Sequence, residues 1–447
     1  MSAGAARPPL AAPEGTTTPA PSPPAAPRPL RLLVLSQYFW PEDFRVNDLV
    51  AELAARGHAV TVLTGVPNYP GGEVFPDFAR DPSAYAAHAG AQVLRVPLRP
   101  RGQGKWRLVL NYWSFVFWGT LLGPWRLRGR AFDAVFVFQT SPVTAALPAL
   151  LIGRIKRAPV LMWVLDLWPD TLAGVGVLRS PRALATVGRL VAFIYHRCAR
   201  VLIASRAFAP NIARWGGTPE RIRYFPNWVE PVYASQDDDG RVAPELAPYA
   251  ATFNLMFAGN LGEAQDLPAI VQAAALLRDE RPQLRWLIVG DGRAADALRA
   301  AIAAQGLGER VLLLGRHPPE RMPAFFRGAQ ALLVTLKADP VFALTVPGKV
   351  QSYLAAGRPL LGMLDGEGAR VIDESGAGFT APAGDAAGLA AAVRRLIDLP
   401  DAARAAMGEA GRAYAEREFD RATLIAALER WLGECAATPA GAGSAPR

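Results

Sequence analysis

The sequence is poor in the residues that build metal sites and disulfide frameworks. It has two cysteines, Cys198 and Cys435, and four histidines among 447 residues. Two cysteines cannot form a disulfide framework, and neither stands at the spacing of a zinc or iron–sulfur motif. The histidines are too scattered to indicate a metal-binding triad. These scarcities disfavour zinc and iron–sulfur chemistry and favour a reducing cytoplasm as the compartment.

Lysine is almost as scarce. Only Lys105, Lys156, Lys337 and Lys349 occur among 48 basic residues, so arginine carries nearly all of the positive charge, and the formal net charge is +9. This imbalance accompanies many alanines and prolines and is typical of codon bias, so it is weak support for nucleic-acid binding. The G-x-G-x-x-G fingerprint is also missing, which disfavours a dinucleotide cofactor.

The two ends of the chain differ in composition from the rest. Residues 1–30 hold nine prolines and eight alanines, without an aromatic residue or an apolar run that resembles a signal-peptide core. Such a segment cannot form a packed structure, so we expect a disordered leader. We expect residues 436–447 to form a shorter disordered tail.

Between the ends, apolar runs of strand length alternate with helical patterns. Residues 31–37 have the length of a strand buried on both faces, residues 47–56 form a helical pattern, and residues 58–64 form a second strand. Strand, helix and strand with short links imply a parallel sheet. Further strands are expected at residues 92–96, 134–138, 159–164, 200–205, 254–258, 285–289, 311–314, 331–334 and 359–363.

A polar segment divides this series into two halves. We interpret residues 229–250 as an interdomain linker, in which the D-x-D pattern of Asp237–Asp239 indicates solvated charge rather than a metal site. We therefore expect an α/β fold with two Rossmann-like, doubly wound domains, residues 31–228 and 251–415, that face each other across a ligand-binding cleft. Residues 416–435 are expected to form a C-terminal helix that crosses back to the first domain.

Two segments of the first half carry candidate site residues. Tyr38–Glu42 follows the first strand and opens a helix, so its backbone N–H groups are suited to an anion. The alternative is an aromatic loop that covers the sheet edge. Asp166 ends another strand, where a carboxylate can bind a sugar hydroxyl or accept a proton. The alternative is that Asp166 or Asp170 caps the following helix.

Two further segments lie in the second half. The glycine-rich junctions Phe257–Asp266 and Val289–Gly292 follow successive strands and offer backbone donors to phosphates, although glycine is also routine in short loops. Lys349 lies near the start of a helix that is expected to end at Gly357. The helix dipole there already favours an anion, so a cation is misplaced unless a phosphate joins it. The alternative is an exposed lysine without function.

In order and spacing, these segments resemble the family 4 glycosyltransferases of the GT-B superfamily, within the branch that builds bacterial surface polysaccharides, such as the fucosamine and colanic-acid transferases. The resemblance extends from about Arg31 to Leu432. The matching segments are Tyr38–Glu42, Gly65–Pro70, Thr140–Pro142, Asp166–Asp170, Phe225–Trp228, Gly259–Gly262, Gly290–Gly292, Gly315–Arg316, Pro347–Lys349 and Ala356–Gly357.

The resemblance implies a glycosyltransferase of the GT-B fold, with a nucleotide-sugar donor, expected to be a UDP-sugar, in the C-terminal half. The implied acceptor is a polyprenyl-diphosphate-linked saccharide in the N-terminal half, used in the synthesis of exopolysaccharide or O-antigen. The expected donor-binding residues are Gly259, Asn260, Gln265, Gly290, Asp291, Gly315, Arg316, His317, Lys349 and Ser352. The expected acceptor-binding residues are Arg45, Asn68 and Tyr69, and the expected catalytic residues are Asp166 and Glu42.

The sequence departs from the family pattern in the second half. Asn260 and Gln265 stand where the family has an arginine and a lysine, and Leu344 and Ser352 stand where it has two glutamates. The usual charge clamp on the leaving diphosphate is therefore partly missing, and Lys349 is the candidate replacement. Helix N-termini and one or two fixed cations can stabilise such charge without a metal, so we expect no metal and no bound cofactor.

A long uncharged segment lies between clusters of basic residues. Leu108–Trp125 contains no charge and would form a helix about 27 Å long, at the lower limit for a membrane span. It lies inside the strand–helix series, so we expect a membrane-docking helix at Trp106–Trp125 rather than a spanning one. Trp106 and Trp113 share one face of this helix, as do Trp118 and Trp125. The alternative is a buried crossover helix.

These patterns predict a cytoplasmic protein that is peripheral at the inner face of the cell membrane. Two other functions stay open. A nucleotide-sugar epimerase can share the two-domain architecture and acts on the donor without an acceptor. An inactive membrane-associated scaffold with a GT-B fold is conceivable because family charges are missing. Nucleic-acid binding is disfavoured because the basic residues cluster around an apolar helix.

Overall fold

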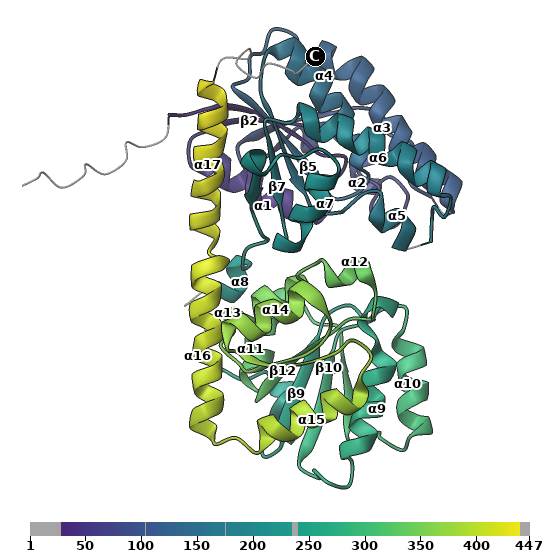
Figure 1. Ribbon diagram of the computed structural model, residues 1–447, viewed down its shortest axis with the longest axis vertical. Helices are drawn as coiled ribbons and strands as arrows, with labels where there is room; N and C mark the ends of the chain where they lie inside the picture. Colours follow the sequence, from purple (N-terminus) through teal and green to yellow (C-terminus); the bar gives the residue numbers. More distant parts are fainter. Residues whose placement is uncertain (1–27, 103, 175, 235–239, 439–447) are drawn as a thin grey trace, which may run out of the picture.

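The computed structural model describes residues 28–438 except 103, 175 and 235–239. It contains two parallel-sheet α/β domains, one above the other in Figure 1. The α/β class and the pair of Rossmann-like sheets that the sequence predicts are confirmed. The leader predicted at residues 1–30 lies outside the described residues up to residue 27, and the tail predicted at residues 436–447 lies outside them from residue 439.

The first sheet has eight strands in the described part of the chain, in the order β3-β4-β2-β1-β5-β6-β7-β8. All neighbouring strands are parallel except β3 and β4. The strands are β1 (Arg31–Leu35), β2 (Ala59–Thr64), β3 (Ala87–His88), β4 (Ala91–Arg95), β5 (Ala134–Gln139), β6 (Val160–Val164), β7 (Arg200–Ile203) and β8 (Ile222–Tyr224).

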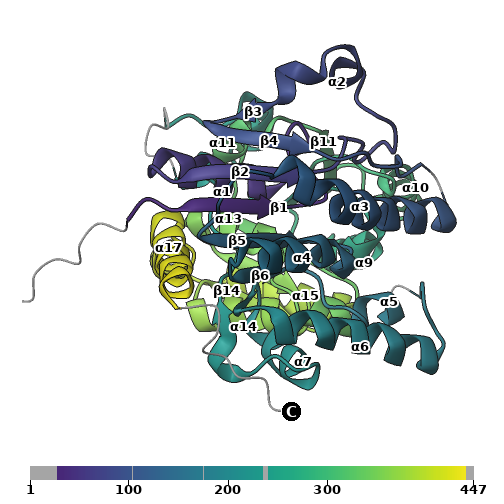
Figure 2. The same ribbon diagram turned by 90° about the horizontal axis from the view of Figure 1, so that it is seen from above.

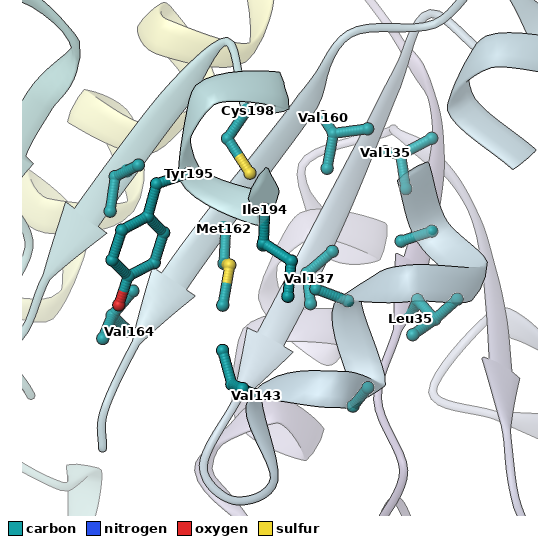
Figure 3. Packing of buried hydrophobic residues seen from close by; sticks show 14 of the residues in the cluster. Leu35, Val135, Val137, Val143, Val160, Met162, Val164, Ile194, Tyr195 and Cys198 are labelled. Atoms are coloured by element: carbon teal, nitrogen blue, oxygen red, sulfur yellow. The ribbon is translucent and has the colours of Figure 1, made fainter. Parts of the chain in front are cut away.

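Helices cover both faces of the first sheet. Apolar side chains of the central strands pack alternately toward either face, and Figure 3 shows one of the two layers, with Val137 and Met162 against Ile194 and Tyr195. The period-two pattern of a strand produces these two layers. The helices of this half are α1 (Arg45–Ala55), α2 (Pro76–Arg80), α3 (Lys105–Arg126), α4 (Ala146–Lys156), α5 (Asp170–Gly174), α6 (Pro181–Arg197) and α7 (Ala209–Arg214).

The second sheet is entirely parallel, in the order β11-β10-β9-β12-β13-β14. Its strands are β9 (Phe253–Ala258), β10 (Leu284–Val289), β11 (Val311–Gly315), β12 (Ala331–Thr335), β13 (Leu360–Met363) and β14 (Gly378–Ala381). The helices are α8 (Pro231–Ala234), α9 (Leu267–Leu277), α10 (Ala295–Ala304), α11 (Met322–Arg327), α12 (Pro340–Ala343), α13 (Gly348–Ala355), α14 (Gly366–Ser375) and α15 (Ala386–Ile397).

Two helices at the end of the chain connect the domains along one side (Figure 1). Helix α16 (Asp401–Glu418) packs against α13 and α14 of the second domain. Helix α17 (Arg421–Ala437) packs against the first domain, where Arg421 binds Asp48 at 2.6 Å. Figure 2 shows α17 beside β1 and β5. The helix continues through Ala437, so the first two residues of the predicted disordered tail are helical.

The domains also contact each other directly, apart from these two helices. Helix α5 of the first domain contacts α12 of the second, and Leu344 packs against the core of the first domain. Nearby, the backbone N–H of Arg206 donates to Oε1 of Glu367 at 3.2 Å. These contacts place the loops after the strands of one sheet opposite the corresponding loops of the other.

Candidate functional site

A cavity of about 770 Å³ lies where the loops after β9, β10 and β11 meet the start of α13. Most of the predicted donor-binding residues line it, namely Gly259, Asn260, Gly290, Asp291, Arg316, His317, Lys349 and Ser352. The other two adjoin it. Gln265 accepts a hydrogen bond from Lys349, and the carbonyl of Gly315 accepts one from the N–H of Gly290 at 2.7 Å. The structure thus brings the ten residues together.

Two glycines allow the loops of this cavity to approach each other. Gly259 and Gly290 have φ angles of +134° and +144°, which side chains rarely tolerate. A Cβ on Gly290 would lie 1.9 Å from the carbonyl oxygen of Gly259, and a Cβ on Gly259 would lie 2.7 Å from Cε of Lys349. Both positions therefore require glycine, and Gly259 leaves room for the side chain of Lys349.

Lys349 lies in the first turn of α13 and points into this cavity. Its Nζ donates to Oε1 of Gln265 at 2.8 Å and lies 3.6 Å from the centre of the Phe257 ring. The hydroxyl of Tyr353, one turn later, accepts from the N–H of Ala258 at 2.8 Å and donates to its carbonyl at 3.0 Å. These two bonds fix α13 against β9 and so position the lysine.

The charge of Lys349 has no counterion. Among the described residues, no carboxylate pairs with it, and burial lowers the pKa of its ammonium group to about 7. A partly buried cation without a partner costs free energy, and an entering anion would remove that cost. The start of α13 adds backbone N–H groups and the positive end of its dipole. The site is therefore prepared electrostatically for a phosphate-bearing ligand.

His317 forms another wall of the cavity and is held on both ring nitrogens. Its Nε2 contacts the carbonyl of Leu314 at 3.0 Å, and its Nδ1 lies 3.0 Å from Nη1 of Arg321. An arginine can only donate, so Nδ1 accepts and Nε2 carries the proton in this arrangement. The ring packs against Phe325. It therefore offers a fixed surface in the wall of the cavity.

Asp166 lies just after β6, on the first domain. Its carboxylate accepts from Oγ1 of Thr171 at 2.5 Å and from Nε1 of Trp168 at 3.1 Å. Burial raises the pKa of Asp166, although the hydrogen bonds from Thr171, Ser141 and Trp168 act in the opposite direction. A half-buried carboxylate at the edge of the sheet can contact a hydroxyl of a bound molecule.

Glu42 has a different environment. It is 1% exposed, and its two oxygens accept from the backbone N–H groups of Phe39, Asn68 and Tyr69 at 3.0, 2.8 and 2.8 Å. The carboxylate joins the loop after β1 to the loop after β2, and both of its oxygens are engaged. These contacts give Glu42 a structural role, and its expected catalytic role stays a prediction.

Two of the expected acceptor-binding residues are also engaged in the fold. The guanidinium of Arg45 donates to the carbonyl of Trp228 at 2.8 Å and to Glu230 at 2.9 Å, which ties the first domain to the linker. Asn68 is 1% exposed and accepts from the N–H of Arg101 at 2.9 Å. Both side chains are occupied by these contacts.

The side chain of Tyr69 is partly exposed, as is that of Arg45, whereas Asn68 is buried. The ring of Tyr69 packs against those of Tyr38 and Phe44, with centroid distances of 5.5 and 5.1 Å.

Sequence reasoning did not identify Glu230, Tyr233 or Tyr353 at the cavity around Lys349. The first two belong to the linker, and no local pattern places a linker in a cavity.

The predicted docking helix is α3, which packs against the first domain by one face. Trp106, Trp113, Phe117, Leu121 and Trp125 are exposed on its other face, Trp106 by 82%. Trp118 instead is only partly exposed and packs against the core, so it does not belong to this surface. No helix within the described residues has the length and apolar character needed to cross a membrane.

Metal-ligating side chains do not gather in the described part of the chain. No group of three or more histidine, cysteine, aspartate or glutamate residues is placed there to hold a metal ion. The positive charge in the donor cavity comes from Lys349, Arg316 and the start of α13.

Two protein families match most of the chain. Residues 44–228 match the family described as "Glycosyl transferase 4-like domain", and residues 252–399 match the family described as "Glycosyl transferases group 1". The two matches meet at the linker between the sheets. Most of the residues that line the cavity lie within the second matched region.

Two relatives are similar over much of their length. The chain is 27% identical to "Probable glycosyltransferase WbjE" of Pseudomonas aeruginosa, over 61% of this chain and 66% of that protein, just under two thirds. It is 25% identical to "Putative colanic acid biosynthesis glycosyl transferase WcaI" of Escherichia coli K12, over 73% of this chain and 82% of that protein.

A solved structure shares the fold over nearly the whole chain. The crystal structure of Anabaena Alr3699/HepE in complex with UDP and glucose superposes with a TM-score of 0.65 at 16% identity, covering 91% of this chain and 100% of that chain. At this identity the similarity shows the fold alone, which is the GT-B arrangement expected from the sequence.

Proposed function

This chain belongs to the group 1 glycosyl transferases with a glycosyl transferase 4-like N-terminal domain, and from this premise we propose that it transfers a sugar from a UDP-sugar to a polyprenyl-diphosphate-linked saccharide. The transfer serves the assembly of a cell-surface polysaccharide at the inner face of the cell membrane. The name of the E. coli relative, which refers to colanic acid biosynthesis, supports the role in polysaccharide assembly.

The unpaired ammonium group of Lys349 in the donor cavity is the observation that carries the proposal. In the reaction, the bond between the anomeric carbon and the diphosphate oxygen breaks, and negative charge develops on the diphosphate. Lys349 and the N–H groups at the start of α13 are fixed before the reaction and stabilise that charge. The UDP in the Anabaena structure supports this choice of nucleotide.

The other cavity residues divide between the diphosphate and the base. The backbone of Gly259 and Gly290 faces the diphosphate in this proposal. Residues 315–317 contact the base, and the fixed ring of His317 forms part of that surface. Asn260 and Ser352 supply uncharged polar groups where the family has charged ones.

The acceptor hydroxyl is placed by the first domain in this proposal. Asp166 lies at the carboxyl edge of its sheet, in reach of a ligand because it is not fully buried. It accepts a hydrogen bond from the attacking hydroxyl and takes its proton as the new glycosidic bond forms. The partly exposed ring of Tyr69 provides a surface for the acceptor saccharide.

The exposed face of α3 docks the protein on the membrane. Tryptophan and phenylalanine rings partition into the headgroup region of a bilayer, and flanking arginines attract anionic lipids. Trp106, Trp113, Phe117 and Trp125 form such a surface, with Arg126 and Arg128 exposed at the end of the helix. A lipid-linked acceptor would thus be presented where the first domain can reach it.

A transfer assay tests the proposed reaction. Purified protein is incubated with a panel of radiolabelled UDP-sugars and with membranes that carry lipid-linked saccharides, and the label in the organic extract is counted. We expect label from one donor to enter the lipid fraction. Conversion of the donor in the absence of membranes would instead indicate an epimerase, and binding without any turnover would indicate a scaffold.

A further inference from the structure

Arg101 lies just before the docking helix in the chain, and the functional assignments above leave it unused. It belongs to the loop between β4 and α3, and its backbone N–H is held by Oδ1 of Asn68. Its side chain is half-buried, and its guanidinium carbon lies 5.5 Å from the centre of the Tyr69 ring. The fold thus keeps a cation against the acceptor-side aromatic residues.

The surroundings of this guanidinium are phenolic rather than acidic. Within the described residues, Arg101 forms no ion pair with a carboxylate. The Tyr69 ring beneath the guanidinium packs against the Tyr38 ring at a centroid distance of 5.5 Å. Burial raises the pKa of Tyr38 and of Tyr112, and Arg101 acts in the opposite direction on both. Guanidinium and hydroxyl groups together form a set of donors suited to a phosphate group.

Helix α3 contacts this cluster with its inner face and carries the exposed aromatic residues on its outer face. Asn111, fully buried on the inner face of α3, accepts from Nε2 of Gln37 at 2.7 Å and from the hydroxyl of Tyr38 at 3.3 Å. Tyr112 is close enough to Ser141 and Asp166 for both to influence its pKa.

The start of α3 supports an anion at this place. The helix begins after Gly104, which provides no side-chain cap, and its first turn contains no acidic residue. Its first N–H groups therefore have no carboxylate in their own turn to accept from them. Arg101 provides the charge, and the helix end adds to it.

We propose that Arg101, together with the hydroxyl of Tyr112, binds the diphosphate of the lipid-linked acceptor while its prenyl chain follows the exposed face of α3. This inference rests on the proposed function, because it names the part of the acceptor that the first domain recognises. It explains why an arginine that forms no ion pair with a described carboxylate is kept half-buried against Tyr69.

Binding of farnesyl diphosphate, a soluble prenyl diphosphate, tests the inference by calorimetry, with farnesol as the phosphate-free comparison. We expect the wild type to bind farnesyl diphosphate at least about tenfold more tightly than farnesol. Arg101→Gln should lose this preference, and Arg101→Lys should keep part of it because a single charge remains. Arg99→Gln is the matched control, since Arg99 is exposed two residues away.

Two further measurements separate the possible failures. Sedimentation with phosphatidylglycerol vesicles should change less than about twofold in Arg101→Gln; a larger loss there, with farnesyl diphosphate affinity unchanged, would assign Arg101 to lipid headgroups and overturn the inference. A thermal shift by UDP in Arg101→Gln shows that the variant is folded and that the donor cavity works. The inference would also be overturned if wild type and Arg101→Gln bound farnesyl diphosphate equally, or if the wild type bound both prenyl compounds equally. A wild type whose melting temperature is not shifted by UDP would instead contradict the proposed donor.

Discussion

Lys349 lies over the face of Phe257, with 3.6 Å between Nζ and the centre of the ring. The aromatic face attracts the ammonium group, and yet burial keeps its pKa at about 7. A small electrostatic change near Lys349 therefore alters the protonation of its ammonium group. A diphosphate bound in the same cavity is such a change, because it favours the charged form.

A pH dependence of UDP binding follows. Bound diphosphate raises the pKa of Lys349 above its value of about 7 in the free protein, so binding above pH 7 requires uptake of a proton. Affinity should fall by up to about tenfold per pH unit above pH 7, and this contribution should vanish below pH 7, where Lys349 is charged in both states. Calorimetry in buffers of different ionisation enthalpy measures the uptake. An affinity that stays constant up to about pH 9 would contradict this.

Replacing Gly290 with alanine should destabilise the second domain. The new Cβ would lie 1.9 Å from the carbonyl oxygen of Gly259, and φ is +144°, so we expect a loss of at least about 2 kcal/mol in the free energy of unfolding, together with weaker UDP binding. Gly433→Ala is the control, since that glycine lies in α17 with open space around it and should gain about 0.5–1 kcal/mol. Urea denaturation measures both. Equal stability of the two variants would refute the packing argument.

Glu42 and Asp166 should separate in a comparison of stability with turnover. Glu42→Gln should lower the free energy of unfolding by about 1–3 kcal/mol, because a neutral amide is a poorer acceptor for three backbone N–H groups. Asp166→Asn should lower kcat by about 10²–10⁴-fold. Melting curves and kcat well below Tm distinguish the two effects. A Glu42→Gln protein of normal stability without turnover would restore its expected catalytic role.

Membrane docking through α3 predicts a loss of vesicle binding when two exposed rings are removed. Trp113→Ala combined with Phe117→Ala should weaken sedimentation with phosphatidylglycerol vesicles by at least about tenfold, since each buried ring contributes about 1.5–3 kcal/mol. Leu276→Ala, an exposed apolar residue on α9 of the other domain, should bind as the wild type does. Unchanged binding of the double variant would remove α3 as the docking surface.

The central strands of both sheets could be predicted from the sequence because parallel strands buried on both faces form continuous apolar runs. The expected strand at 134–138 is observed as Ala134–Gln139, with every residue buried. The strands β3, β8 and β14 were not predicted. Each has two to four residues, lies at the edge of its sheet and is only partly buried, so no apolar run identifies it.

The donor cavity could be predicted better than the acceptor side. Lys349 stood out because a scarce cation at a helix start is a local feature, and the structure places it in the cavity. The role of Glu42 depends on contacts with residues 68 and 69, far away in the sequence, which no local pattern contains. Trp118 was misassigned because the seven-residue spacing to Trp125 does not specify which edge of the helix the core covers.

The affinity for UDP of wild type, Lys349→Met and Lys337→Met, measured by calorimetry at pH 7 with uridine as the phosphate-free comparison, tests the central claim most directly. Lys337 is an exposed lysine on the same domain and serves as the matched control. We expect wild type and Lys337→Met to bind UDP much more tightly than uridine, and Lys349→Met to lose at least about tenfold in affinity for UDP alone. Equal UDP affinity in all three proteins would contradict the account, because the diphosphate would then not be held by Lys349.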